Sequence, residues 1–155
     1  MPVNLYIAYY ARTPTPKIPG RYHTALIVLP TRLSTTDIIR LLRYSLSTMS
    51  LPESSTMAKY HVVNVPVADE TGKGRISWEF RVENDTTSLR LKLIALMLVG
   101  VIEPIGETVE EIVRNVDVPK YADERPEWRC TTWVFEALKV RLHFLLSIHH
   151  CLSHA

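Results

Sequence analysis

The chain has 155 residues, of which 46% are hydrophobic and 22% charged, the composition of an ordinary globular protein long enough to bury a core. Its 18 basic and 16 acidic residues leave a net charge of only +2, so we expect no nucleic-acid or membrane-surface partner. Two cysteines are too few for a disulfide framework, and the N-terminus has no signal-peptide pattern. The longest apolar run is about half of the roughly 20 residues that a membrane span needs. We therefore predict a cytoplasmic protein with a single domain over residues 1–155.

The first part of the chain predicts two strands, a loop and a helix. Residues 4–10 are rich in aromatic and branched side chains, and residues 22–29 are apolar on both faces, so the second strand is expected to be central. The proline-rich stretch between them predicts a surface loop. Ser34, followed by an acid three residues later at Asp37, predicts a helix start. The apolar spacing then continues the helix to about residue 47.

The middle of the chain predicts a flexible loop and three further strands. Residues 48–59 are rich in serine and threonine and predict the loop. Residues 60–67 and 75–83 flank a short polar turn, which is typical of a hairpin. Apolar and polar residues alternate along the second of these strands, so one of its faces is expected to meet the core. The aliphatic run over residues 91–102 predicts a central strand or, alternatively, a short buried helix.

Two helices and an unusual tail are predicted for the rest of the chain. Residues 106–116 place four branched side chains on one helical face. A second helix begins at Cys130. Residues 140–155 are apolar and rich in histidine, so we expect them to continue the helix, to pack against a partner or to be disordered. Together the elements predict an α+β fold, in which about three helices pack on a mostly antiparallel sheet of about five strands.

One cysteine and two histidines carry the predicted chemistry. A helix N-terminus favours the nucleophilic thiolate of a cysteine such as Cys130, and such a nucleophile needs a base. His23 and His61 each follow a tyrosine at the start of a strand. Adjacent antiparallel strands would separate these histidines to opposite ends of the sheet, whereas a parallel crossover would bring them together. His23 is the preferred base because its strand is central, and His61, Asn64 and Glu79 are the candidates for the group that orients it.

The order of these residues, two strand histidines and then a cysteine that opens a late helix, resembles the circularly permuted papain-like enzymes. That group includes the lecithin:retinol acyltransferase family and the PPPDE isopeptidases, and in the acyltransferases a second histidine orients the first. Most of the chain also looks like a family of small fungal proteins of uncharacterised function, through Tyr22-His23, Tyr60-His61-Val62-Val63-Asn64, Trp78-Glu79-Phe80 and Trp128-Arg129-Cys130-Thr131-Thr132-Trp133-Val134. This resemblance implies a small α+β domain, from which the chain departs after Leu138.

We therefore expect a cysteine-dependent enzyme that hydrolyses or transfers the acyl group of an ester, a thioester or an amide. Cys130 would attack the carbonyl, His23 would take and return the proton, and N–H groups at the helix start would stabilise the oxyanion. Tyr22, Trp128 and Trp133 are expected to line the pocket or the core. The expected substrate is a small molecule or a peptide, and no cofactor or metal is expected.

The alternative is a non-catalytic binding or scaffold protein. Cysteine is among the most frequently buried residue types, so Cys130 would then be a core residue. The apolar segment over residues 140–155 would need to be covered, which favours a homodimer formed through that segment. The two hypotheses differ in whether Cys130 and His23 meet.

Overall fold

The computed structural model describes residues 3–12, 22–30, 32–43, 57–84, 93–102 and 108–140. The strands are β1 (Val3–Ala11), β2 (Tyr22–Leu29), β3 (Ala58–Ala68), β4 (Gly74–Glu83) and β5 (Leu93–Ile102). The helices are α1 (Thr35–Arg43), α2 (Val109–Arg114) and a third helix over residues 130–140, which we name the Cys130 helix. Within the described residues, no helix combines the length and the hydropathy that a membrane span requires.

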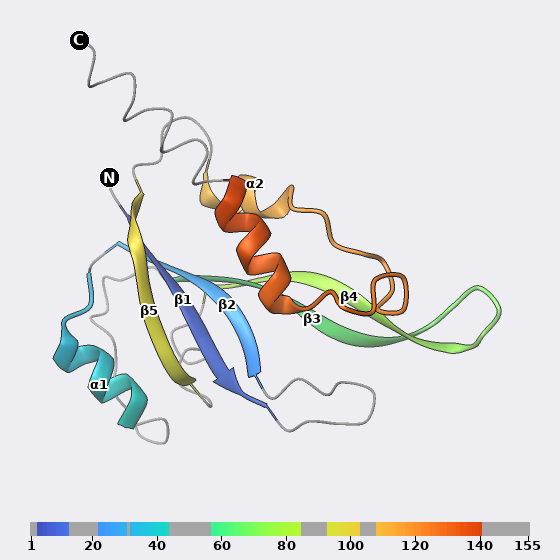
Figure 1. The fold of residues 1–155 in the computed structure, drawn as a ribbon, viewed down its shortest axis with the longest axis horizontal. Helices are drawn as coiled ribbons and strands as arrows, with labels where there is room; N and C mark the ends of the chain where they lie inside the picture. Colours follow the sequence, from blue (N-terminus) through green and yellow to red (C-terminus); the bar gives the residue numbers. More distant parts are fainter. Residues whose placement is uncertain are drawn as a thin grey trace, which may run out of the picture.

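The strands form one antiparallel sheet in the order β4-β3-β2-β1-β5 (Figure 1). The predicted α+β fold is confirmed, including the third helix that begins at Cys130. Side chains alternate between the two faces of each strand, and the faces contribute to two separate apolar clusters. One cluster lies under α2 and the Cys130 helix and includes Leu5, Ile7, Leu26, Val62, Val113, Trp133 and Val134. The other lies on the opposite face and includes Tyr6, Ala8, Tyr10, Ile27 and Leu29.

The predicted helix start at Ser34 is confirmed by two reciprocal hydrogen bonds. The Asp37 N–H donates to Ser34 Oγ at 3.1 Å, and the Ser34 N–H donates to Asp37 Oδ2 at 3.1 Å. Both bonds satisfy backbone N–H groups at the helix start, which have no carbonyl partner inside the helix. Thr108 and Glu111 form the same capping box at the start of α2. The predicted end of the first helix near residue 47 lies outside the described residues.

The predicted hairpin is confirmed as the β3–β4 connection. Asp69 Oδ1 accepts the N–H groups of Thr71 and Lys73, both at 2.9 Å, which holds the turn. Gly72 has a φ of 80°, a conformation that glycine adopts without steric cost. Trp78, predicted to face the core from β4, is buried.

The strand predicted over residues 91–102 is confirmed as β5, but its predicted central position is wrong. β5 pairs with β1 and forms one edge of the sheet. Ile94, Met97 and Val101 on this strand remain 45%, 51% and 54% exposed. A continuous apolar run is typical of a strand buried on both faces, and the same pattern here belongs to an apolar edge.

Candidate functional site at the β2–β3 junction

The two histidines meet just beyond the short pairing of β2 with β3. These strands are adjacent and antiparallel, and the paired region is three residues long, beginning at Leu26 opposite Tyr60. His23 and His61 follow as diagonal neighbours on one face, and His23 Nε2 lies 2.7 Å from His61 Nδ1. The expectation that antiparallel strands would separate them is therefore wrong. β3 begins at Ala58, so His61 is not at the start of its strand.

Glu83 on β4 extends this pair of histidines. Its Oε1 lies 3.0 Å from His61 Nε2, and its Oε2 lies 2.5 Å from Lys59 Nζ. Lys59 is buried and directly opposite Glu83 in the β3–β4 register. The His61 N–H is at bonding distance but is not aimed closely at the carboxylate, so Nε2 is left without a fully formed hydrogen bond.

The hydrogen-bond partners assign the proton positions of both rings. A carboxylate only accepts hydrogen bonds, so His61 Nε2 carries the proton that faces Glu83. A neutral His61 then accepts at Nδ1, and His23 donates its Nε2–H to that atom. The remaining nitrogen of His23, Nδ1, consequently holds a lone pair. The chain of residues therefore presents His23 as a base at Nδ1.

Burial keeps both rings neutral. Burial lowers the pKa of His23 to about 3; His61, Lys59 and Arg12 act in the same direction, and Glu83 acts against them. Burial likewise lowers the pKa of His61 to about 4, assisted by Lys59 and opposed by Glu83. Both histidines are uncharged at neutral pH, as the proton assignment requires.

The thiol of Cys130 lies against the backbone of β2. Cys130 is 3% exposed, and its Sγ accepts the backbone N–H of Thr24 at 3.4 Å. The Thr24 hydroxyl is 2.8 Å from the hydroxyl of Thr131, the next residue of the helix. These two contacts fix the start of the Cys130 helix on the residue that follows His23.

The side chains of Cys130 and His23 approach β2 from different sides. His23 lies on the face that carries Tyr10, with their ring centroids 6.1 Å apart, while the neighbouring Thr24 projects toward the helix. Among the described residues, no hydrogen bond joins Cys130 to His23 or to His61. The structure thus brings the two histidines together and places the thiol one residue away along the backbone of β2.

Arg12 adds a positive charge near the thiol. Burial lowers the pKa of Arg12, while Cys130 raises it and Arg129 lowers it. One terminal nitrogen of Arg12 is buried and has no hydrogen-bond partner in the described part of the chain.

The other predicted site residues lie apart from the histidines. Glu79, a candidate for the group that orients His23, instead pairs with Arg81 at 3.2 Å on the exposed surface. Tyr22 is 55% exposed at the start of β2. Trp128 and Trp133 are buried in the core beneath the helix.

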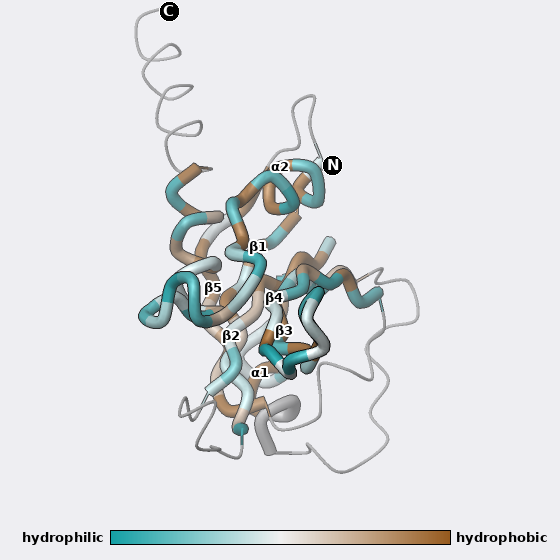
Figure 2. The backbone as a smooth tube through the Cα atoms, turned by 90° about the vertical axis from the view of Figure 1, so that its right-hand side faces the viewer, coloured by the Kyte–Doolittle hydropathy of each residue, from teal (hydrophilic) through white to brown (hydrophobic). Residues whose placement is uncertain are grey.

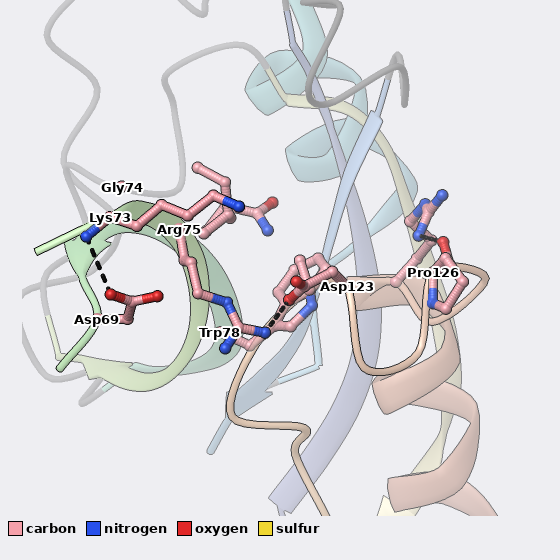
Figure 3. A pocket seen from close by; sticks show the side chains of 11 residues that line it. Asp69, Lys73, Gly74, Arg75, Trp78, Asp123 and Pro126 are labelled. Atoms are coloured by element: carbon pink, nitrogen blue, oxygen red, sulfur yellow. Dashed lines mark hydrogen bonds and ion pairs between the residues drawn. The ribbon is translucent and has the colours of Figure 1, made fainter. Parts of the chain in front are cut away.

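Asn64 lines a pocket of about 690 Å³ between the β3–β4 hairpin and the segment that leads into the Cys130 helix (Figure 3). The pocket is lined by Asn64, Asp69, Lys73, Gly74, Arg75, Ile76, Trp78, Ala122, Asp123, Pro126 and Arg129. Arg75 is paired with Asp123 at 2.5 Å, and Arg129 donates to the carbonyl oxygens of Pro126 and Trp128. Cys130 is not in the lining, although Arg129 precedes it directly.

Sequence reasoning missed Lys59, Glu83, Thr24, Thr131 and Arg12. The composition of residues 48–59 predicts a loop that includes Lys59, whereas Lys59 belongs to β3. The alternation along β4 places Glu83 on the same face as Glu79, so the sequence offered both acids, and only the register with β3 selects Glu83. The sequence could have indicated Thr24 and Thr131, because Thr24 follows His23 and Thr131 follows Cys130.

Comparison with known proteins gives a family without a known activity. No curated protein and no solved structure matches the chain. The model of a family of unknown function, DUF6914, matches residues 3–144, and the chain therefore belongs to this family.

Proposed function

We propose that the protein is a cytoplasmic, cysteine-dependent hydrolase or acyltransferase of the permuted papain-like kind. The single observation that carries this function is the chain of side chains from Glu83 through His61 to His23, next to a thiol that opens a helix. Such a chain holds one histidine in the tautomer that can accept a proton. It is an arrangement that a merely packed cysteine does not require.

In the proposed reaction, His23 Nδ1 accepts the proton of Cys130 as the sulfur bonds to the carbonyl carbon of an ester, a thioester or an amide. N–H groups at the helix start stabilise the negative oxygen. The leaving group takes the proton from His23 and departs. The acyl group remains bonded to Cys130 as a thioester. Water or a second substrate then attacks this thioester, and His23 again transfers the proton. Glu83 favours the positive charge that His23 carries transiently.

Two movements are needed for this chemistry. The ring of His23 must turn through the gap between β2 and β3 to bring Nδ1 to the sulfur, because no hydrogen bond joins these side chains in the described residues. The thiol must also become accessible, since Cys130 is 3% exposed. The pocket that ends at Arg129 is the candidate entrance, because it lies one residue from the nucleophile.

A covalent acyl-enzyme tests the proposed function directly. We expect p-nitrophenyl acetate to release about one equivalent of p-nitrophenol in a burst and to leave one acetyl group on Cys130. Peptide mapping by mass spectrometry locates the acetyl group. Cys151→Ala serves as the matched control and should keep the burst, whereas Cys130→Ala should lose it. A burst of equal size in both variants, or no acetyl group on Cys130, would refute the nucleophile.

Glu83→Gln is expected to slow acylation of Cys130 by about tenfold or more, because the glutamine no longer fixes the tautomer of His61. The same change leaves the buried Lys59 without its carboxylate partner, so the free energy of unfolding should also fall, by about 3 kcal/mol. Glu79→Gln, on the same strand and face, is the control and should change neither quantity. Equal acylation rates in the two variants would remove Glu83 from the site.

The rival function is a non-catalytic binding or scaffold protein. It is favoured by the burial of Cys130 within the core cluster around Trp133 and Val134. In that case Cys130→Ala would change stability and leave no chemical activity to lose. The apolar segment through which such a protein was expected to dimerise lies, after Val140, outside the described residues.

A further inference from the structure

The two edges of the described sheet differ in how well they are protected against pairing with a further strand. The β4 edge carries charged side chains and is bonded to the segment that precedes the Cys130 helix: the Ala122 N–H donates to Ile76 O at 2.8 Å, and the Trp78 N–H donates to Lys120 O at 3.3 Å. Among the residues that the structure describes, β5 has neither device. Its ten residues, LIALMLVGVI, include no charge and no proline (Figure 2), although charges and prolines are the usual means of protecting an edge strand.

Side chains of β5 are incompletely covered on both faces of the sheet. Met97, opposite Ile7, lies on the face of the Cys130 helix and is 51% exposed. Val101, opposite Asn4, lies on the other face and is 54% exposed. Val99, at an irregularity of the pairing, is 38% exposed. A single helix or a small ligand would cover one of these faces and leave the other exposed.

We propose that β5 pairs antiparallel with β5 of a second copy of this chain, so that two five-stranded sheets join into one. Antiparallel pairing of identical strands obeys a two-fold axis normal to the sheet, so each copy buries the same patch. Because β5 has no charge, self-pairing brings no like charges together. In such a pair the exposed side chains of one β5 lie beside those of the other β5 on both faces of the joined sheet.

The position of α1 favours the later half of β5 for this contact. α1 packs beside β5 (Figure 1), and Leu33, just before α1, packs against the same apolar cluster as Leu96 and Leu98. The residues from Met97 to Val101 include the two most exposed large hydrophobic side chains of the strand. We therefore place the two-fold axis within this stretch.

The oligomeric state of the full chain tests the pairing. Sedimentation velocity over a range of micromolar concentrations should show a species of twice the 17.8 kDa chain mass. Met97→Lys and Val101→Lys should each raise the dimer dissociation constant by about 100-fold, because both copies carry the change and each contributes about tenfold. Phe135→Lys, which changes a 49% exposed side chain on the Cys130 helix, is the matched control and should leave the dimer intact.

Three results would overturn the proposed dimer. A wild-type chain that stays monomeric at every concentration would show that another part of the chain or another protein covers β5. A dimer that tolerates both lysines would place the interface elsewhere, and one that only Phe135→Lys dissociates would place it on the helix. Circular dichroism spectra matching the wild type would show that the variants are folded. In the dimer, amide hydrogens of β5 should exchange more slowly as concentration rises, and Met97→Lys should abolish that dependence.

Discussion

His23→Ala is expected to slow acetylation of Cys130 by p-nitrophenyl acetate by about 10²- to 10⁴-fold, the usual contribution of a positioned general base. The reason is specific to one atom. His61 and Glu83 assign the proton of His23 to Nε2, so Nδ1 is the nitrogen that can accept the proton of the thiol. The rate is measured as a single turnover in the Cys151→Ala background, where Cys130 is the remaining cysteine of the two in the chain.

Rescue by a small molecule distinguishes a general base from a residue whose role is only structural. Free imidazole added to His23→Ala should restore a substantial part of the acetylation rate, with a dependence on the concentration of neutral imidazole. A change of packing alone would not be repaired in this way. An unchanged rate in His23→Ala would assign the proton transfer to another group and leave His23 as a structural partner of His61.

The second large effect is a loss of stability in mild acid. The half-buried His23 and the buried His61 have a pKa of about 3 and about 4 in the folded protein, below the value of roughly 6.5 that an unfolded chain has. Below pH 6.5 the unfolded state therefore binds more protons than the folded state, and the free energy of unfolding falls as the pH falls. The slope approaches about 1.4 kcal/mol per pH unit for each histidine. From pH 7 to pH 5 we expect a total loss of about 2 to 4 kcal/mol.

Urea unfolding at pH 5, 6, 7 and 8 measures this effect. Carboxylates also take up protons toward pH 5, so the histidine contribution is the difference between variants. His61→Gln should make the pH dependence shallower than in the wild type, and the double change with His23→Gln should make it shallower still. The same pH dependence in all three chains would mean that the two rings are protonated in the folded protein.

Local signals in the sequence predicted the elements that local interactions build. The start of α1 follows from Ser34 and Asp37, which bond to each other within one turn. The β3–β4 hairpin follows from a polar turn in which Asp69 bonds to its own neighbours. The start of a helix at Cys130 is likewise predicted from neighbouring residues. In each case the residues that carry the signal and those that form the structure are within a few positions of one another.

Strand order and register could not be predicted, because they depend on residues far apart in the chain. The apolar run of β5 fits a central strand as well as an exposed edge. The meeting of His23 with His61 depends on which residues of β2 and β3 are paired, and an offset of a few residues would separate them. The selection of Glu83 over Glu79 depends on a second register, between β3 and β4.

The short pairing of β2 with β3 also has a consequence for motion. β4 and β3 are joined along ten paired residues and β1 and β2 along eight, whereas β2 and β3 share three in the described structure. Regions with few backbone hydrogen bonds open at a lower free energy than the whole protein. We therefore expect the sheet to open along this short pairing, between the β3–β4 hairpin and the β2-β1-β5 group, where Cys130 and both histidines lie. Local opening along this pairing would expose the thiol and free the ring of His23 in a single event, without unfolding either group of strands.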